Sequence, residues 1–235
     1  MMKIDTEYRV TYRPGYDPDA KDLILHNHHL ALWNKTLPNG KSFNLRSNGQ
    51  KPYKLLHDSD LGHFELSSDS IIHSYKYVKR MEPVINAMPK GYVDAFFDTA
   101  CSIGGYIIFP SNKVNEKQTI NVERGINRLI WDRFDLTLEC IRRWYAGEES
   151  PLYACLDRYK NFFQLFGSFS GYVKFFLLED LVNEDMTAVR FWLPFKEFDI
   201  TSTLPKNVNE YSQYSKNSSD FTIARNKRMK DWATL

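Results

Sequence analysis

Two kinds of hydrophobic segment occur in the middle of the chain. In the segment 134–146, apolar and aromatic residues recur every three or four positions, at Phe134, Leu138, Ile141 and Tyr145. This spacing places them on one buried face of a helix. The segment 106–110, Tyr-Ile-Ile-Phe-Pro, combines aromatic and β-branched residues and ends in a proline. That composition is typical of a strand.

Further segments carry helix signals. Ser67–Ser70 resembles a run of N-cap residues and predicts a helix from residue 70, which Pro83 should end or kink. A second helix is expected over 90–102, stopped by Gly104 and Gly105. Helical order is expected almost continuously from about Val122, with later helices after Pro151, over 171–182 and over 207–235.

The first third of the chain has shorter, mixed signals. We expect an extended arm over 1–22, with a turn at 13–18, and a helix or strand over 23–33. Short strands are expected in the segments 41–46, 53–58, 119–121 and 188–195. The fold class is therefore α+β, a predominantly helical single domain of residues 1–235 with a small β-sheet that includes 105–110.

Composition narrows the class of protein. The 235 residues are 43% hydrophobic and 15% aromatic, which predicts a large folded core. The net charge of +2 gives no global reason to bind nucleic acid, so such a partner is not expected. Three cysteines without pair spacing favour a reducing cytoplasm, and no apolar stretch has the length of a signal or a membrane span. We therefore expect no membrane partner, and the oligomeric state stays open.

Several long motifs carry a resemblance. They are IGGYIIFP at 103–110, DRFDLTLECIRR at 132–143 and GYVKFFLLEDLV at 171–182, with LPNGKSFNL near the start and IARNKRMKDW near the end. With these motifs the chain resembles a family of bacterial proteins described as a domain of unknown function. The resemblance spans most of the chain and implies a compact bacterial cytoplasmic domain. It implies no activity.

The histidines are confined to the first third of the chain, at His26, His28, His29, His57, His63 and His73. Together with nearby aspartates they suggest a hydrolytic metal site, but their spacing matches no common ligand pattern. Histidines in the core or on a solvated helix face are the simpler interpretation. We therefore expect no metal, and no motif indicates a cofactor.

A second group of chemically active residues follows the strand 106–110. It contains Arg124, Arg128, Asp132, Arg133, Asp135, Glu139, Arg142 and Arg143. A structural ion-pair network explains the group, and Glu139 with Arg143 has the favourable i,i+4 order. The alternative is an anion site, because glycines allow close backbone approach and a helix N-terminus with arginine attracts phosphate or carboxylate.

Three functions stay open at this point. The leading hypothesis is a protein that binds a small anionic or nucleotide-like ligand near Gly104, Gly105, Arg124 and Arg128. The second is a hydrolase or transferase acting on a phosphorylated or nucleotide substrate, with His73 or Asp132 transferring the proton. The third is a protein–protein interaction module that uses the N-terminal arm and the basic C-terminal helix.

Overall fold

A four-stranded antiparallel sheet lies at the centre of the molecule. The computed structural model describes residues 4–12 and 16–233. The sheet has the order β3-β4-β5-β6, formed by Leu45–Ser47, Leu55–Ser59, Gly62–Ser70 and Tyr106–Pro110. A separate two-stranded sheet pairs β1 (Lys35–Thr36) with β2 (Ser42–Phe43). The predicted strand at 106–110 is confirmed, and it is an edge strand.

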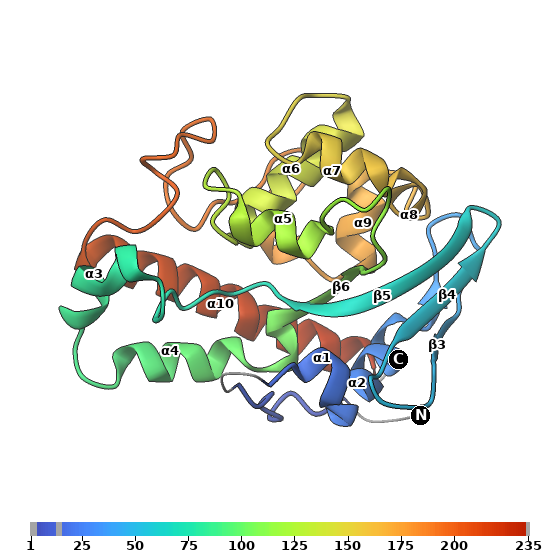
Figure 1. Cartoon of the computed structure of the whole chain (residues 1–235), viewed down its shortest axis with the longest axis horizontal. Coiled ribbons are helices and arrows are strands. Elements are labelled where there is room, and N and C mark those ends of the chain that lie inside the picture. Colours follow the sequence, from blue (N-terminus) through green and yellow to red (C-terminus); the bar gives the residue numbers. More distant parts are fainter. Residues whose placement is uncertain (1–3, 13–15, 234–235) are drawn as a thin grey trace.

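Helices cover the sheet from several sides. In Figure 1, helices α5–α9 lie above β5 and β6, α1 and α2 lie below them, and α10 runs beside α4. The helices are α1 (Pro18–Lys21), α2 (Leu23–Trp33), α3 (Glu82–Asn86), α4 (Tyr92–Ala100), α5 (Ile120–Ile126), α6 (Phe134–Ala146), α7 (Tyr153–Arg158), α8 (Lys160–Gln164), α9 (Phe169–Phe175) and α10 (Val208–Trp232). Short 3-10 turns are η1 (Lys79–Met81), η2 (Ile103–Gly105) and η3 (Glu179–Leu181). The class is α+β, as predicted.

Within the described part of the chain, no helix combines the length and the apolar composition that a membrane crossing requires.

Helix α6 shows why these residues form these elements. Phe134, Leu138 and Ile141 are fully buried, so the apolar period read from the sequence is confirmed as the core face. The helix ends where Gly147 adopts a left-handed conformation with φ of 72°, which a glycine accepts without strain. Its buried face contacts α7 and α9.

Helix α10 is tied to the centre of the molecule by a buried arginine. The guanidinium of Arg225 donates 2.8 Å hydrogen bonds to the carbonyl oxygens of Gly104 and Tyr106, and a 3.0 Å bond to that of Phe176. Asn226 on the same helix accepts a 2.7 Å bond from the Gly104 amide. Side chains of one helix therefore supply hydrogen-bond partners for backbone groups of η2, β6 and the end of α9.

The two glycines of η2 allow this close packing. A Cβ atom on Gly104 would lie 2.7 Å from the Asn226 side-chain oxygen, and one on Gly105 would lie 2.0 Å from the Ala100 carbonyl oxygen. Both glycines are buried. They bring η2 against α10 and α4, and this packing explains the glycine pair without a ligand.

The predicted helix from residue 70 is wrong. Residues 67–70 belong to β5, and the only α-helix before α4 in this region is the five-residue α3. Polar residues with helix-cap character also suit a strand when their side chains have partners in the interior, and here Ser68 and Asp69 are both buried. Pro83 lies in the first turn of α3, where proline is tolerated, and does not end a helix.

The continuous helix expected from Val122 is also wrong. Helix α5 ends at Ile126, and the chain then turns through a loop before α6 begins at Phe134. Trp131 and Asp132 have φ values of 48° and 59° in this loop, which no helix accommodates. Arg124, Arg128 and Asp132 therefore do not share one helical face.

Two expected strands are absent from the described residues. Thr119 caps α5 through its hydroxyl, which accepts a bond from the Val122 amide, so 119–121 is a helix start. The 188–195 segment contributes only a single bridge between Val182 and Val189. Short apolar runs carry too little periodicity to separate strand from loop.

The N-terminal segment crosses the main body but is not extended throughout. The amide of Val10 donates to the Cys101 carbonyl at 2.9 Å, and Asp17 caps the short helix α1. Part of the predicted turn at 13–18, residues 13–15, lies outside the described residues, as do residues 234–235 of the expected C-terminal helix.

Candidate functional site

A cavity of about 310 Å³ opens where the N-terminal segment crosses the end of β5 and the C-terminal end of α4. Its polar lining includes Asp17, Asp19, Ser68, Asp69, His73 and Asp132. Aromatic side chains of Tyr12, Tyr77, Phe97 and Tyr106 supply much of the apolar wall. None of the described lining residues is a lysine or an arginine, so the polar surface of the cavity is acidic.

Arg124 lies directly behind two of these aspartates. Its guanidinium is fully buried and pairs with the carboxylate of Asp69, and its Nη2 lies 3.1 Å from Oδ1 of Asp132. Its Nε donates a 2.9 Å bond to the hydroxyl of Thr137 on α6. The arginine therefore holds two carboxylates of the cavity and has no free face toward a ligand.

Burial, opposed by the guanidinium of Arg124, sets the protonation of Asp69. Burial raises the pKa of Asp69, and the charge of Asp132 adds to this, although Arg124 opposes both effects. For Arg124, burial acts to lower the pKa, but the two carboxylates outweigh it and the pKa is raised. The arginine stays charged, and Asp69 holds a proton more readily than an ordinary aspartate.

Asp19 reaches the cavity from α1. One oxygen of its carboxylate accepts a 2.6 Å hydrogen bond from the amide of Ser68 in β5. Burial raises the pKa of Asp19 to about 7. The hydrogen bond from Ser68 acts to lower this pKa, and the charge of Asp17 acts to raise it. Asp19 therefore changes its charge near neutral pH.

His73 presents a fixed hydrogen-bond donor. Its Nδ1 accepts a 2.8 Å bond from the amide of Tyr75, which places the proton of the neutral ring on Nε2. Burial lowers the pKa of His73, an effect that Asp132 opposes and Arg124 reinforces. Near neutral pH the ring is uncharged, and its Nε2–H has no partner among the described residues.

The hydroxyl of Ser68 is a second donor. The indole N–H of Trp33 donates to Nδ1 of His29 at 3.0 Å, so the ring of His29 carries its proton on Nε2 and donates to the Ser68 hydroxyl oxygen at 2.7 Å. His29 cannot then accept the Ser68 proton. Ser68 is therefore not activated as a nucleophile, and its O–H is left to donate elsewhere.

The residues proposed from the sequence separate into two groups. His73 and Asp132 both line the cavity, and Arg124 supports it from behind. Gly104 and Gly105 are buried against α10 and α4 outside the cavity lining, and Arg128 is exposed on the loop after α5. The four residues of the expected anion site are therefore not brought together.

The remaining histidines are spread over the first third of the fold. His26 bonds the Ser47 hydroxyl, His28 accepts from the Asp5 amide, His57 contacts the Asn44 carbonyl, and His63 pairs with Asp58 on the surface. Among the residues that the structure describes, no three potential metal-binding side chains lie close enough to hold an ion.

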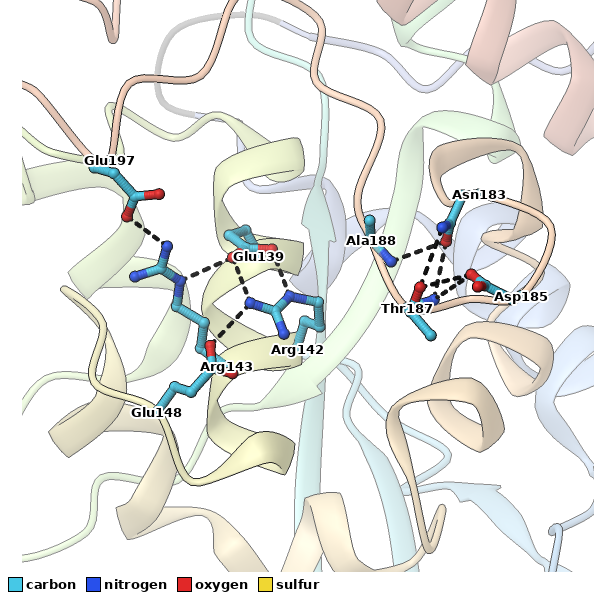
Figure 2. A network of polar contacts seen from close by, with 9 residues as sticks. All are labelled: Glu139, Arg142, Arg143, Glu148, Asn183, Asp185, Thr187, Ala188 and Glu197. Carbon is cyan, nitrogen blue, oxygen red and sulfur yellow. Dashed lines mark hydrogen bonds and ion pairs between the residues drawn. The ribbon is translucent and has the colours of Figure 1, made fainter.

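Arg133, Arg142 and Arg143 form two ion-pair groups separate from that of Arg124. Arg133 pairs with Asp135 in the interior. Figure 2 shows the second group, in which the Glu139 carboxylate receives 2.8 Å contacts from Arg142 and Arg143, which also reach Glu148 and Glu197. This confirms the i,i+4 pair and ties α6 to the loop before α10.

Asp19, Asp69 and Ser68 were not singled out as site residues from the sequence. Asp69 was read as part of a helix cap, and Asp19 as part of the extended N-terminal arm. One signal was available: an aspartate with a serine on each side in a strand, whose carboxylate is costly to bury without a cationic partner.

Comparison with known proteins places the chain in a family. It belongs to a family of unknown function, DUF6994, whose model matches residues 4–229. No curated protein and no solved structure matches the chain.

Proposed function

We propose that the acidic cavity binds a small organic cation, such as a primary amine or an amidine. One observation carries the proposal: four aspartates line the cavity, and the charged group behind them, Arg124, already pairs with two of them. A cation would replace protons on Asp19 and Asp69, whose pKa values are raised by burial.

The walls of the cavity suit such a ligand. Tyr12 and Tyr77 are 54% and 71% exposed, so their rings are available to an incoming group. Aromatic faces attract organic cations, and the Nε2–H of His73 and the hydroxyl of Ser68 offer two donors for an acceptor on the same ligand. The ligand expected from the arginines was anionic, but a phosphate in this cavity would face carboxylates. A nucleobase with an amidine edge stays compatible.

Calorimetric titration with benzamidine tests the proposal. We expect binding that releases protons, and at least about a tenfold loss of affinity in Asp132→Asn, which removes one charge contact. Asp157→Asn changes an exposed aspartate on α7 and is the matched control. Binding of inorganic phosphate at this cavity, with no binding of benzamidine or of simple alkylamines, would show that the cation assignment is incorrect.

A second candidate function is a hydrolase or transferase. The observation that favours it is the pair of carboxylates on one arginine, because a protonated Asp69 can donate a proton while Asp132 acts as base. A nucleoside suits this arrangement, since its base leaves more easily once protonated. Incubation with a nucleoside panel tests this: turnover should be lost in both Asp69→Asn and Asp132→Asn, and turnover that survives both substitutions refutes the assignment.

The proposed setting is a bacterial cytoplasm. It is supported by the three cysteines, which are free and buried, as expected for a protein kept in a reducing compartment. Fractionation of the source cells with an antibody tests the location, and recovery outside the cytoplasm contradicts it.

A further inference from the structure

Lys35 lies in a cage of aromatic rings on the strand β1. Its Nζ is 5.0 Å from the ring centre of Trp33, 4.7 Å from that of Phe175 and 4.9 Å from that of Trp232. No carboxylate of the described residues lies within ion-pair distance of this amine. A lysine that is surrounded by rings and lacks a counter-ion is unusual, because an ammonium group is normally solvated or paired.

The amine borders a second cavity, of about 410 Å³, that shares no lining residue with the acidic one. Ser168, Ser170 and Lys174 line it together with Lys35. The two serine hydroxyls lie 3.1 Å apart, and both charged side chains among the described lining residues are lysines. This cavity therefore offers an amine, two hydroxyls and a positive charge.

Burial of Lys35 favours its uncharged form. Burial lowers the pKa of Lys35 to about 7, although Glu179 on η3 opposes the shift; Arg225 on α10 adds to it. Lys174 on α9 also carries a positive charge on this side. The rings attract the ammonium and so oppose part of this lowering of the pKa. A larger share of Lys35 is therefore neutral near pH 7 than of an ordinary lysine.

We propose that Lys35 is a carbonyl-reactive amine that forms an imine with a small oxo acid. The neutral nitrogen adds to the carbonyl carbon and one of its protons passes to the carbonyl oxygen. The second N–H proton then passes to the same oxygen, which leaves as water while the carbon–nitrogen double bond forms. The step needs no oxidant or reductant. The acid group of the ligand faces the exposed Lys174, and the hydroxyl proton left free by the Ser168–Ser170 bond is donated to one of its oxygens.

Reductive trapping tests the proposal on the intact protein. Glyoxylate and cyanoborohydride convert an imine into a stable carboxymethyl amine, which peptide mass spectrometry locates. At pH 7 we expect Lys35 to be labelled at least about tenfold faster than Lys216, an exposed lysine of α10 in the same digest, because of its larger neutral fraction. Labelling of Lys35 no faster than that of Lys216 overturns the proposal.

Two variants test the roles of Lys35 and Lys174 separately. Lys35→Arg keeps the charge and should abolish this label while other lysines react as before. Lys174→Gln should slow the reaction with glyoxylate but leave the reaction with uncharged acetaldehyde unchanged. An equal effect on both aldehydes removes the oxo-acid assignment. Should Lys35→Arg fail to fold, the comparison of Lys35 with Lys216 in the unchanged protein still decides the proposal.

Discussion

Removal of the Arg124 side-chain charge should destabilise the protein strongly. Arg124→Met keeps an unbranched side chain of similar length but leaves Asp69 and Asp132 without their shared cation. Asp69 is 7% exposed and Arg124 is fully buried, so water cannot replace the lost contact at Asp69. Removal of one partner from a buried ion pair costs about 3–5 kcal/mol. That is a large share of a typical folding free energy of about 5–15 kcal/mol.

Urea unfolding of the unchanged protein, Arg124→Met, Asp69→Asn and the double variant measures this effect. Asp69→Asn alone should cost less than Arg124→Met, because Asp132 still pairs with the arginine. The double variant should cost less than the two single variants added together, since no unpaired carboxylate then remains at position 69.

The pH dependence supplies an independent check. In Arg124→Met burial still raises the pKa of Asp69 above that of the unfolded chain, so the folded form binds more protons and its stability should rise as the pH falls from 7 to 5. If Arg124→Met lowers the free energy of unfolding by less than about 1 kcal/mol, or if this decrease is not smaller at pH 5 than at pH 7, the buried arginine does not neutralise the two carboxylates.

Two further predictions concern α6 and Asp19. Leu138→Ala should cost about 2–5 kcal/mol in urea unfolding, because Leu138 is fully buried and its loss leaves a cavity. Glu139→Ala should cost about 1–2 kcal/mol, since its two arginine partners reach the surface and can be hydrated; equal losses would contradict this. For Asp19, the raised pKa of about 7 means that the folded chain keeps a proton that the unfolded chain loses above about pH 4. The contribution of Asp19 to the free energy of unfolding therefore falls as the pH rises, by at most about 4 kcal/mol. Because Asp19 is partly exposed, the actual decrease should be smaller. Asp19→Asn should be more stable than the unchanged protein at pH 8 and similar at pH 4, and a difference that does not vary with pH would show that Asp19 titrates normally.

The sequence predicted elements whose period is long or whose composition is distinctive. Helix α6 has an apolar face that repeats through several turns, and the strand 106–110 has a dense run of ring and β-branched residues. These local signals agree with the packing that each element meets. The prediction from Ser67–Ser70 was wrong because a polar run suits a helix cap or a strand equally. In the strand, the buried carboxylate of Asp69 is stabilised by its ion pair with Arg124, which is distant in the sequence.

The cavity was predictable only in part. His73 and Asp132 were chosen for their chemistry, but their neighbours Asp19 and Ser68 come from distant segments that the sequence does not connect. Arg124 and Asp132 were expected on one face of a helix, but a loop with left-handed residues brings them together. Long-range partners of this kind depend on tertiary structure, which local patterns do not encode.

The position of Arg225 has a consequence for biosynthesis. Its guanidinium satisfies carbonyl oxygens of Gly104, Tyr106 and Phe176, residues that leave the ribosome well before α10 does. Until α10 emerges, those carbonyls lack their donor, and the apolar surface that the helix covers stays open to other chains. Folding of the centre must therefore wait for α10. A nascent chain that stalls before Arg225 should be a client for chaperones.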